Sequence, residues 1–476
     1  TGYLFPSHAW DALWYHLPMV GYIMQNGAIQ ENPTPLFISF INTFPKNIEL
    51  FFLWNTIFLK SDIIVDLSQL PFTIAGILTI YNVCIKLRIK KEYAIYSSFL
   101  FFFTPVIILQ STTNYIDIGV SVLFLIAINF LTPYLSLRGS QSEPKQSLEI
   151  SHFAQNDRIP ILLAGLTTGI LLGSKGSGPL FVVVLLAVIM VQEVIKRIII
   201  SSKDSLRFTT YDLRSYVVFF IAPVFLMGGY WYIKNWVLYN NPVYPMDVSF
   251  FNITLFKGSF DVWINVWINV WKSEPAFDII NQLFPFFRPF YVWLEREKYY
   301  FYDARFSGFG PMWFILFLPS IVFSLVYALK KKKYNFLFVI AIIIITFLIY
   351  PRNWHTRYVI FIIGLGAISF GFILDYFNNK GNIFKLVAFL LVVYTFFSAN
   401  SPCITPSKIK EFISLPVKER TIARQAPWNI DSMARIEYGY WIWISNNILK
   451  GDTLAYTFKP LFLYPLWNSE LSNKIV

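Results

Sequence analysis

Charged residues are scarce in this sequence: Asp, Glu, Lys and Arg together make up only 14% of its 476 residues. A soluble globular domain carries about 25% charged residues, so a soluble protein of this length is excluded. Cysteine is nearly absent, and two residues, Cys84 and Cys403, cannot build the disulfide framework of a small secreted fold. A disordered chain is excluded as well, because hydrophobic residues reach 56%.

Histidine is also rare, with only four residues, at positions 8, 16, 152 and 355. The sequence contains no His-Glu-x-x-His pattern and no pair of cysteines at metal-ligand spacing. A zinc site built by the protein therefore has little support. We expect no metal ligand set and no certain cofactor, and a divalent metal bound by acids stays an open alternative.

The hydrophobic residues are gathered in long runs. A helix that crosses the hydrocarbon core needs about 20 mostly apolar residues. Ten runs come close to this length, and the shortest of them, 160–174, is expected to form a tilted or re-entrant element if it does not cross directly. The ten predicted spans are 63–87, 93–111, 116–135, 160–174, 179–199, 216–233, 309–329, 334–350, 358–377 and 383–399.

Basic residues set the orientation of these spans. The 39 Lys and Arg residues exceed the 27 acids by 12, and many of them lie in the connectors 86–91, 196–214, 330–333 and 380–385. An even number of crossings separates these connectors, so all of them can face the cytoplasm together. The net charge thus indicates membrane orientation rather than nucleic-acid binding. The same parity predicts one more span before residue 1, and the sequence is expected to be a fragment at both ends.

The sequence therefore predicts an all-α polytopic membrane bundle, with about ten spans visible and a small α/β segment on the outer face near its C-terminal end. Residues 1–60 are expected to form a first outer loop with interfacial helices, and 234–306 a second long outer loop. Spans are expected in 61–233 and 307–400, and 401–476 are expected to form an extracytoplasmic soluble tail that is truncated.

The second outer loop contains the repeat Val262-Trp-Ile-Asn-Val-Trp-Ile-Asn-Val-Trp271. Its three Trp residues fall at i, i+4 and i+8 and share one stripe of a helix. This pattern is typical of an interfacial helix with Trp at headgroup depth. It indicates a membrane anchor, and a role in guiding a lipid is the alternative.

Two acids on the predicted outer face are candidates for chemistry. Asp11 stands among Trp10, Trp14 and Tyr15 at the start of an apolar helix, which would bring Tyr15 to the same face at i+4. Asp117 opens the third predicted span on the same side of the membrane. A carboxylate placed there loses hydration unless it has a partner or a task. Because Asp also serves as an N-cap, both interpretations stay open for each acid.

Cationic side chains are expected on the same face. Lys175 lies in Gly173-Ser-Lys-Gly-Ser-Gly178, which is not a P-loop but could hold a phosphate through backbone N–H groups and charge. Arg352, His355 and Arg357 form a second group, just before the span 358–377. Arginine can bind a phosphate with two parallel hydrogen bonds. The alternative is that these side chains snorkel to lipid headgroups of the outer leaflet.

Several motifs carry a resemblance to a known family. The string Ser7-His-Ala-Trp-Asp-Ala-Leu-Trp-Tyr-His-Leu-Pro18 resembles the first outer loop of bacterial GT-C membrane glycosyltransferases. These are polytopic enzymes related to protein O-mannosyltransferases and to the lipid A aminoarabinose transferase. Further similar stretches are Gly229-Tyr-Trp-Tyr-Ile-Lys-Asn-Trp236, Asn240-Asn-Pro-Val-Tyr-Pro245, Gly308-Phe-Gly-Pro-Met-Trp313 and Thr356-Arg-Tyr358.

The resemblance implies a membrane enzyme that moves a sugar from a polyprenyl-phosphate carrier to a glycan, lipid or protein acceptor, with inversion. It implies that Asp11 is the general base, whereas Asp117 as a second acid rests on position. The expected substrate pocket comprises Trp14, Tyr15 and His16. The candidate ligands of the donor phosphate are Lys175, Lys234, Arg352, His355 and Arg357.

The expected location is the inner membrane of a bacterium, with the active site on the extracytoplasmic side and membrane lipids around the spans. Three other functions stay open. A glycan polymerase or ligase would use a diphosphate-linked donor. A transporter should show inverted repeats and ionisable residues near the centres of its spans, which this sequence lacks. A non-catalytic relative would serve as a scaffold in a larger assembly.

Overall fold

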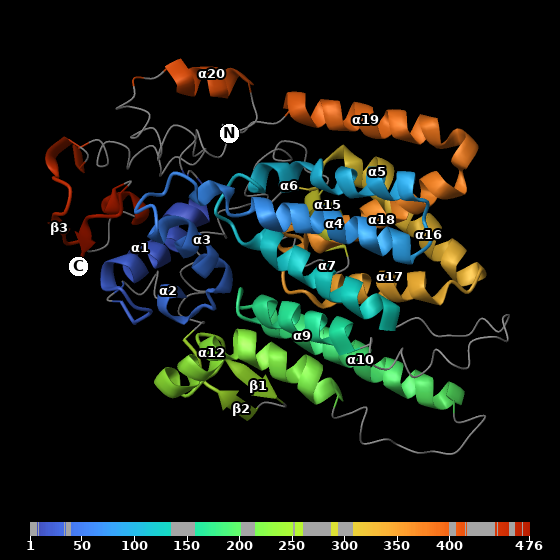
Figure 1. Ribbon diagram of the computed structural model, residues 1–476, viewed down its shortest axis with the longest axis horizontal. Helices are drawn as coiled ribbons and strands as arrows, with labels where there is room; N and C mark the ends of the chain where they lie inside the picture. The colour runs from blue at the N-terminus through green and yellow to red at the C-terminus, as the bar shows by residue number, and fades with distance from the viewer. Residues whose placement is uncertain are drawn as a thin grey trace.

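A computed structural model gives the architecture of the chain (Figure 1). The residues that it describes are 7, 9–32, 34, 40–134, 158–200, 215–250, 253–259, 287–293, 308–398, 406–414, 416, 443–444, 446–456, 462–468 and 470–476. Most of these residues are helical, and the long helices run side by side in a bundle.

The predicted spans correspond to apolar helices. Four helical stretches in the described part of the chain are long and apolar enough to cross a membrane: Val65–Lys86, Val217–Tyr239, Trp313–Lys330 and Gly381–Ser398. They comprise η3 (Val65–Leu67) with α4 (Leu70–Lys86), η4 (Val217–Ile221) with α12 (Ala222–Tyr239), η5 (Trp313–Phe317) with α16 (Leu318–Lys330), and α19 (Gly381–Ser398). Shorter apolar helices fill the bundle: α7 (Asp117–Tyr134), α9 (Arg158–Leu172), α10 (Gly178–Ile200), α17 (Tyr334–Ile349) and α18 (Phe361–Tyr376).

One predicted span, 93–111, differs from the expectation because it is two helices. These are α5 (Lys91–Phe102) and α6 (Pro105–Gln110). Between them Thr104 is extended, with φ −69° and ψ 134°. The cause is Pro105, because proline disfavours the helical conformation of the residue before it. The short run 160–174, in contrast, is continuously helical up to Leu172 as part of α9, which packs between α7 and α12.

The centre of the bundle is α18. It packs against α4, α5, α7, α16 and α17, and nearly all of its side chains are buried. Two glycines permit this close packing. A Cβ atom on Gly364 would lie 2.7 Å from Leu125, and one on Gly366 would lie 2.6 Å from Phe317. The 3-10 turn η6 (Thr356–Val359) leads directly into α18, so its side chains are fixed to the best-packed helix.

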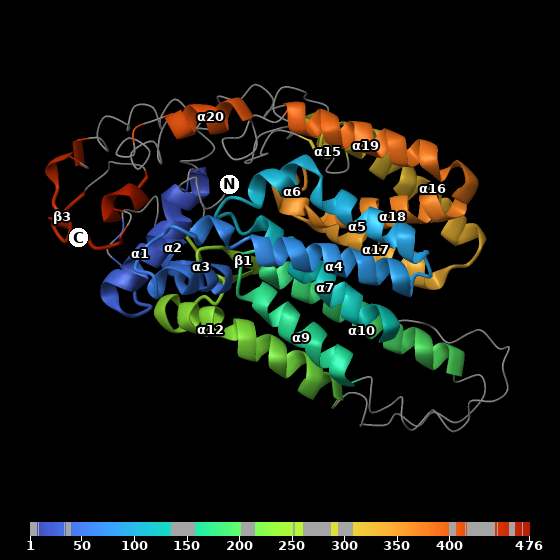
Figure 2. The same cartoon turned by 45° about the horizontal axis from the view of Figure 1, so that its top comes forward.

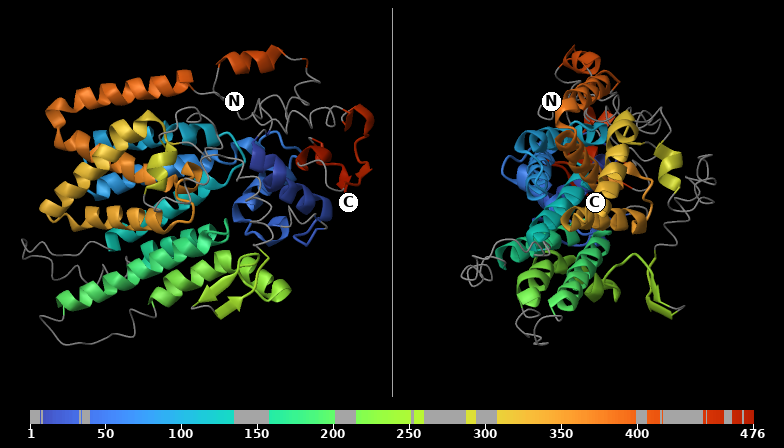
Figure 3. Two further views of the ribbon diagram at one scale, coloured as in Figure 1. Left: turned by 180° about the vertical axis from the view of Figure 1, so that it is seen from behind. Right: turned by 90° about the vertical axis from the view of Figure 1, so that its right-hand side faces the viewer.

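Short elements gather at one end of the bundle (Figures 1 and 3). The first loop contributes η1 (Ala12–His16), α1 (Leu17–Asn26), α2 (Phe40–Thr43) and α3 (Asn47–Ile57). The last residues contribute β3 (Thr453–Leu454), η8 (Tyr464–Trp467) and β4 (Lys474–Ile475), and η8 packs on α1. The first and last parts of the chain therefore meet there. Two further helices are α20 (Pro406–Ser414), which lies beyond the end of α19 in Figure 2, and η7 (Asn378–Lys380).

The tail and the second outer loop contain little regular structure among the described residues. In the tail, the expected α/β character amounts to α20, η8 and the parallel pair of β3 and β4. In the second loop, β1 (Val248–Phe250) and β2 (Ile253–Phe256) form an antiparallel hairpin that the sequence did not predict, and α15 (Arg288–Trp293) follows. The Trp-rich repeat 262–271 lies outside the described residues.

Candidate active site

Asp11 stands at the beginning of a helical rod. The rod starts as the π-helical turn η1 and continues without a break into α1. Asp11 occupies the N-cap position, but its side chain makes no cap hydrogen bond. The N-cap interpretation is therefore wrong for this carboxylate, which binds a cation instead. A π-helical turn is uncommon and often marks a functional position.

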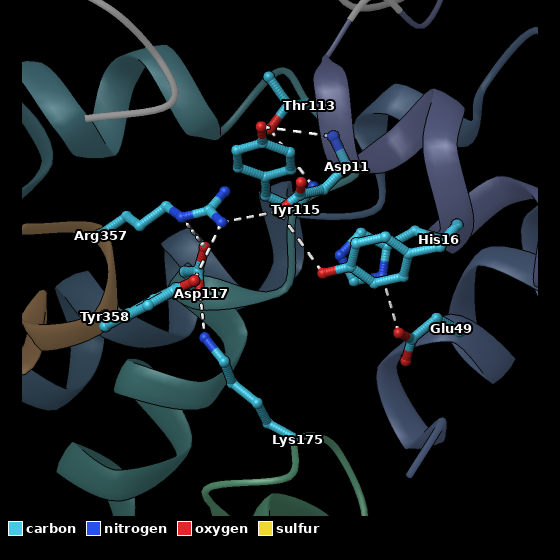
Figure 4. A network of polar contacts seen from close by, with 10 residues as sticks. Asp11, His16, Glu49, Thr113, Tyr115, Asp117, Lys175, Arg357 and Tyr358 are labelled. Atoms are coloured by element: carbon cyan, nitrogen blue, oxygen red, sulfur yellow. Dashed lines mark hydrogen bonds and ion pairs between the residues drawn. The ribbon is translucent and has the colours of Figure 1, made fainter. Parts of the chain in front are cut away.

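That cation is Arg357, which reaches both candidate acids from η6 (Figure 4). Its Nη2 atom lies 2.8 Å from Oδ2 of Asp11, and its Nε atom lies 3.8 Å from Oδ2 of Asp117. Lys175, in the turn between α9 and α10, forms an ion pair with Oδ1 of Asp117. We call Asp11, Asp117, Lys175 and Arg357 the charge cluster. Its two acids and two cations come from four separate parts of the chain, and their formal charges balance.

The charge cluster is largely removed from solvent. The side chains of Arg357 and Asp117 are 5% exposed and that of Asp11 is 8% exposed. Charges in such a position interact strongly, because little water screens them. Burial is the largest single effect and alone would lower the pKa of the Lys175 ammonium, but Asp117, Tyr350 and Tyr358 together outweigh it, and the pKa is raised. Lys175 is therefore a cation at neutral pH.

Three tyrosines line the charge cluster. The Tyr115 hydroxyl accepts the backbone N–H of Asp11 at 3.4 Å, and its ring lies 4.8 Å from the Arg357 guanidinium. The Tyr358 hydroxyl accepts a hydrogen bond from Arg357 at 3.2 Å, and its ring centre lies 4.0 Å from the Lys175 ammonium. The third, Tyr15, donates its hydroxyl to Oδ2 of Asp11 at 3.5 Å.

Tyr15 stays protonated next to this acid. Burial raises the pKa of its hydroxyl well above 10, and the neighbouring Asp11 carboxylate raises it further. Its ring also contacts those of Trp14, at 5.7 Å between centres, and His16, at 4.0 Å. The three residues of the expected substrate pocket thus form one aromatic cluster beside the acid, and their role in binding stays a prediction.

His16 has a partner that the sequence did not indicate. Its Nδ1 atom lies 2.8 Å from Oε1 of Glu49 on α3, and both side chains are almost completely buried. This contact joins η1 to α3 (Figure 4). The other oxygen of Glu49, Oε2, is buried and has no hydrogen-bond partner among the residues that the structure describes.

The other expected phosphate ligands are placed less directly. His355 is fully buried, with its ring stacked on Tyr358 at 5.0 Å. Arg352 lies in the preceding turn with φ 58°, and its carbonyl accepts the backbone N–H of His355. Lys234, on α12, donates to the Asn42 carbonyl at 2.7 Å rather than joining the charge cluster. Their part in phosphate binding stays a prediction.

The described residues do not fit a divalent metal. They contain no group of three or more His, Cys, Asp and Glu side chains close enough to hold an ion. The two acids that could share a metal, Asp11 and Asp117, are instead joined through Arg357. A metal placed between them would have to displace this cation.

Sequence reasoning missed Tyr115, Tyr358 and Glu49. Two of them had a local signal, because Tyr115 precedes Asp117 by two residues and Tyr358 directly follows Arg357. Glu49 is the single charged residue of the mostly apolar stretch 47–59, which already set it apart. Their contacts with Asp11, Lys175 and His16, however, join residues that are distant in the sequence, and these contacts follow from the fold alone.

No protein-family model matches this chain, and no curated protein matches it. Its fold is distantly similar to solved GT-C membrane glycosyltransferases. The apo structure of ArnT from Cupriavidus metallidurans is 13% identical, with a TM-score of 0.46 over 93% of this chain and 69% of that one. The structure of ArnT from the same organism bound to undecaprenyl phosphate is 12% identical, with a TM-score of 0.44 over 93% of this chain and 68% of that one.

The apo oligosaccharyltransferase of Archaeoglobus fulgidus is 12% identical, with a TM-score of 0.47. The match covers 99% of this chain but 60% of the archaeal protein. What the site can do follows from its own residues: it holds two carboxylates and two cations in one buried cluster, a combination that suits proton removal beside a bound anion.

Proposed function

We propose that this protein is a membrane glycosyltransferase. It would transfer a sugar from a polyprenyl-phosphate carrier to an acceptor hydroxyl on the outer face of a bacterial inner membrane, with inversion. The observation that carries the proposal is the charge cluster, in which Arg357 contacts Asp11 at 2.8 Å and Lys175 lies beside the second acid. The sequence motifs around Asp11 and Arg357 support the same reaction.

Asp11 is proposed as the general base. An acceptor hydroxyl is a poor nucleophile, and it gains reactivity when a carboxylate takes its proton during the attack on the anomeric carbon. Tyr15 and the Arg357 guanidinium fix the carboxylate at Oδ2, while Tyr115 holds the backbone at the same residue. Attack from the side opposite the phosphate would invert the anomeric centre.

Arg357 and Lys175 are proposed to stabilise the departing lipid phosphate. Negative charge grows on the phosphate as the glycosidic bond breaks, and fixed cations in a water-poor site stabilise that charge by several kcal/mol. Arg357 can offer two parallel N–H donors to a phosphate, and Lys175 adds a compact charge. The Tyr358 ring lies against both cations and limits where they can point.

Binding of the donor would change the pairing within the charge cluster. Its two acids and two cations already balance, so an added phosphate must compete with the carboxylates for Arg357 and Lys175. A guanidinium that turns from Asp11 to the phosphate leaves this carboxylate with less positive charge nearby. A carboxylate that loses a cationic partner becomes a stronger base. The base would therefore be most effective when the donor is present.

The test is transfer from undecaprenyl-phosphate-linked sugars to crude cell-envelope acceptors, followed as release of undecaprenyl phosphate. Wild type should release it, and Asp11→Asn should lower the rate by about 100-fold or more, the range found for general bases. Asp375→Asn is the matched control, because this acid pairs with Lys90 away from the charge cluster. Equal rates for wild type and Asp11→Asn would remove the assignment of the base. Activity with diphosphate-linked donors alone would assign the protein to the polymerases or ligases.

A further inference from the structure

The last residues of the chain hold the rod that carries Asp11. We call residues 12–26 (η1 and α1) the acid rod, and residues 462–468 with 470–476 the C-terminal clamp. At 1.5 Å per residue the acid rod is about 22 Å long. Asp11 directly precedes one end, and Gln25 lies near the other. The clamp contacts residues at both ends.

The far end of the acid rod is bound by three kinds of contact. The Trp467 ring is fully buried and lies edge-on to Tyr22 at 4.8 Å, and its Nε1–H donates to Oε1 of Gln25 at 3.2 Å. The Gln25 amide also donates to the Ile475 carbonyl at 2.9 Å, and its Oε1 accepts the backbone N–H of Ile475 at 2.8 Å. Both the nitrogen and the oxygen of the Gln25 side-chain amide therefore form hydrogen bonds with the clamp.

A glycine makes this contact possible. A Cβ atom on Gly21 would lie 2.7 Å from Cδ2 and 2.9 Å from Cε2 of Trp467. These distances are far below a normal carbon–carbon contact, and the ring is enclosed on its other sides. Glycine in the middle of a helix costs about 1 kcal/mol relative to alanine. Its presence in α1 is explained by the need to admit the Trp467 ring.

The near end of the acid rod and the adjoining loop are bound as well. Phe462, also fully buried, lies edge-on to Trp10 at 4.7 Å, one residue before Asp11. The Tyr464 hydroxyl donates to Oδ2 of Asp62 at 3.0 Å, which joins the clamp to the segment before α4. The clamp therefore fixes the rod at both ends and ties it to the bundle.

We propose that the C-terminal clamp positions Asp11 against Arg357, with Trp467 and Gln25 as positioning residues that act through the acid rod. The inference rests on the proposed function. Arg357 is fixed beside the buried helix α18, whereas Asp11 belongs to the first loop, so their 2.8 Å contact depends on how that loop is held. A displacement of about 1 Å at a reacting group can lower a rate by about 100-fold.

The sharpest test is Gly21→Ala, which changes none of the side chains that make the contacts between the acid rod and the C-terminal clamp. The new methyl group must displace the Trp467 ring, although alanine by itself favours the helix. We expect kcat to fall by about 10- to 100-fold with the KM for the donor unchanged. Gly381→Ala is the control, because a Cβ atom there would lie 3.6 Å from its nearest neighbour, an ordinary contact. Trp467→Phe, which keeps a ring but loses the hydrogen bond to Gln25, should retain more activity than Trp467→Ala.

A double variant separates positioning from general damage. In an Asp11→Asn background, Gly21→Ala should cause no further loss of rate, because the group that it displaces is already absent. An equal loss in both backgrounds would overturn the proposal. So would a Gly21→Ala variant that keeps the wild-type kcat.

Hydrogen exchange tests the clamp without any activity. The amides of residues 9–17, read by mass spectrometry of the full chain, should exchange faster in Gly21→Ala than in wild type or Gly381→Ala. Unchanged exchange would refute the clamp even if kcat falls. Failure of wild type to transfer any sugar would refute the proposed function instead, and a rise in exchange would then limit the clamp to ordering the acid rod.

Discussion

The balance of charge in the charge cluster makes a quantitative prediction about stability. Arg357→Gln removes a cation that lies 2.8 Å from Asp11 and 3.8 Å from Asp117, and it leaves two buried acids with Lys175 as the remaining cation of the cluster. Removal of one partner from a buried ion pair costs about 3–5 kcal/mol. We expect the free energy of unfolding in detergent to fall by this amount.

A double variant restores the balance of charge in the charge cluster. Asp11→Asn alone leaves an excess positive charge in the charge cluster and should also destabilise the protein. The double variant Asp11→Asn with Arg357→Gln leaves Asp117 paired with Lys175, so its loss should be smaller than the sum of the two single losses. Residues that contact each other in this way show coupling energies of up to about 3 kcal/mol. We expect a value near the upper end of that range.

The control is the exposed ion pair between Lys450 and Glu470, whose side chains are 69% and 51% exposed. Water screens such a pair, and its coupling energy should stay below about 1 kcal/mol. The same cycle of two single variants and one double variant measures it. A coupling energy for Asp11 and Arg357 no larger than this control would refute the reasoning about buried, balanced charge.

Two further predictions concern residues around the site. Burial and the nearby Lys234 lower the pKa of Lys46 in the folded protein to about 7. Above pH 7 the unfolded chain therefore binds more protons than the folded protein does. The free energy of unfolding should then rise from pH 7 to 9 by up to about 1.4 kcal/mol per pH unit. Thermal unfolding should show a smaller rise in Lys46→Met but the wild-type rise in the exposed control Lys91→Met. Gly173→Ala should lower the unfolding temperature, because its Cβ atom would lie 2.2 Å from Nδ2 of Asn47, whose amide is held by hydrogen bonds. Gly176→Ala, with 3.6 Å to its nearest neighbour, should not.

The helices of the bundle could largely be predicted from the sequence, because hydrophobicity over about 20 residues is a local property. The break between Phe102 and Pro105 was missed for the same reason: the window averages across Thr104 although proline restricts that residue. The hairpin of β1 and β2 was missed because its strands are only three and four residues long. Such short strands leave a weak pattern.

The candidate site was predictable in part. Parity of the basic connectors put Asp11, Asp117, Lys175 and Arg357 on one face of the membrane, and the structure brings these four together. Parity gives no distances within that face, so the same argument included Lys234, whose ammonium instead donates a hydrogen bond to the Asn42 carbonyl. Whether these residues carry the proposed chemistry stays a prediction.

The contact between the acid rod and the C-terminal clamp also sets an order of events during biosynthesis. Gln25 is synthesised early, and its hydrogen-bond partners Trp467 and Ile475 follow more than 440 residues later. The spans can enter the membrane one after another while Asp11 still lacks its fixed position. The described contacts of the acid rod can therefore form only after residues 462–476 have been translated. A ribosome that stops shortly before residue 462 would leave an inserted protein whose acid is present but not placed.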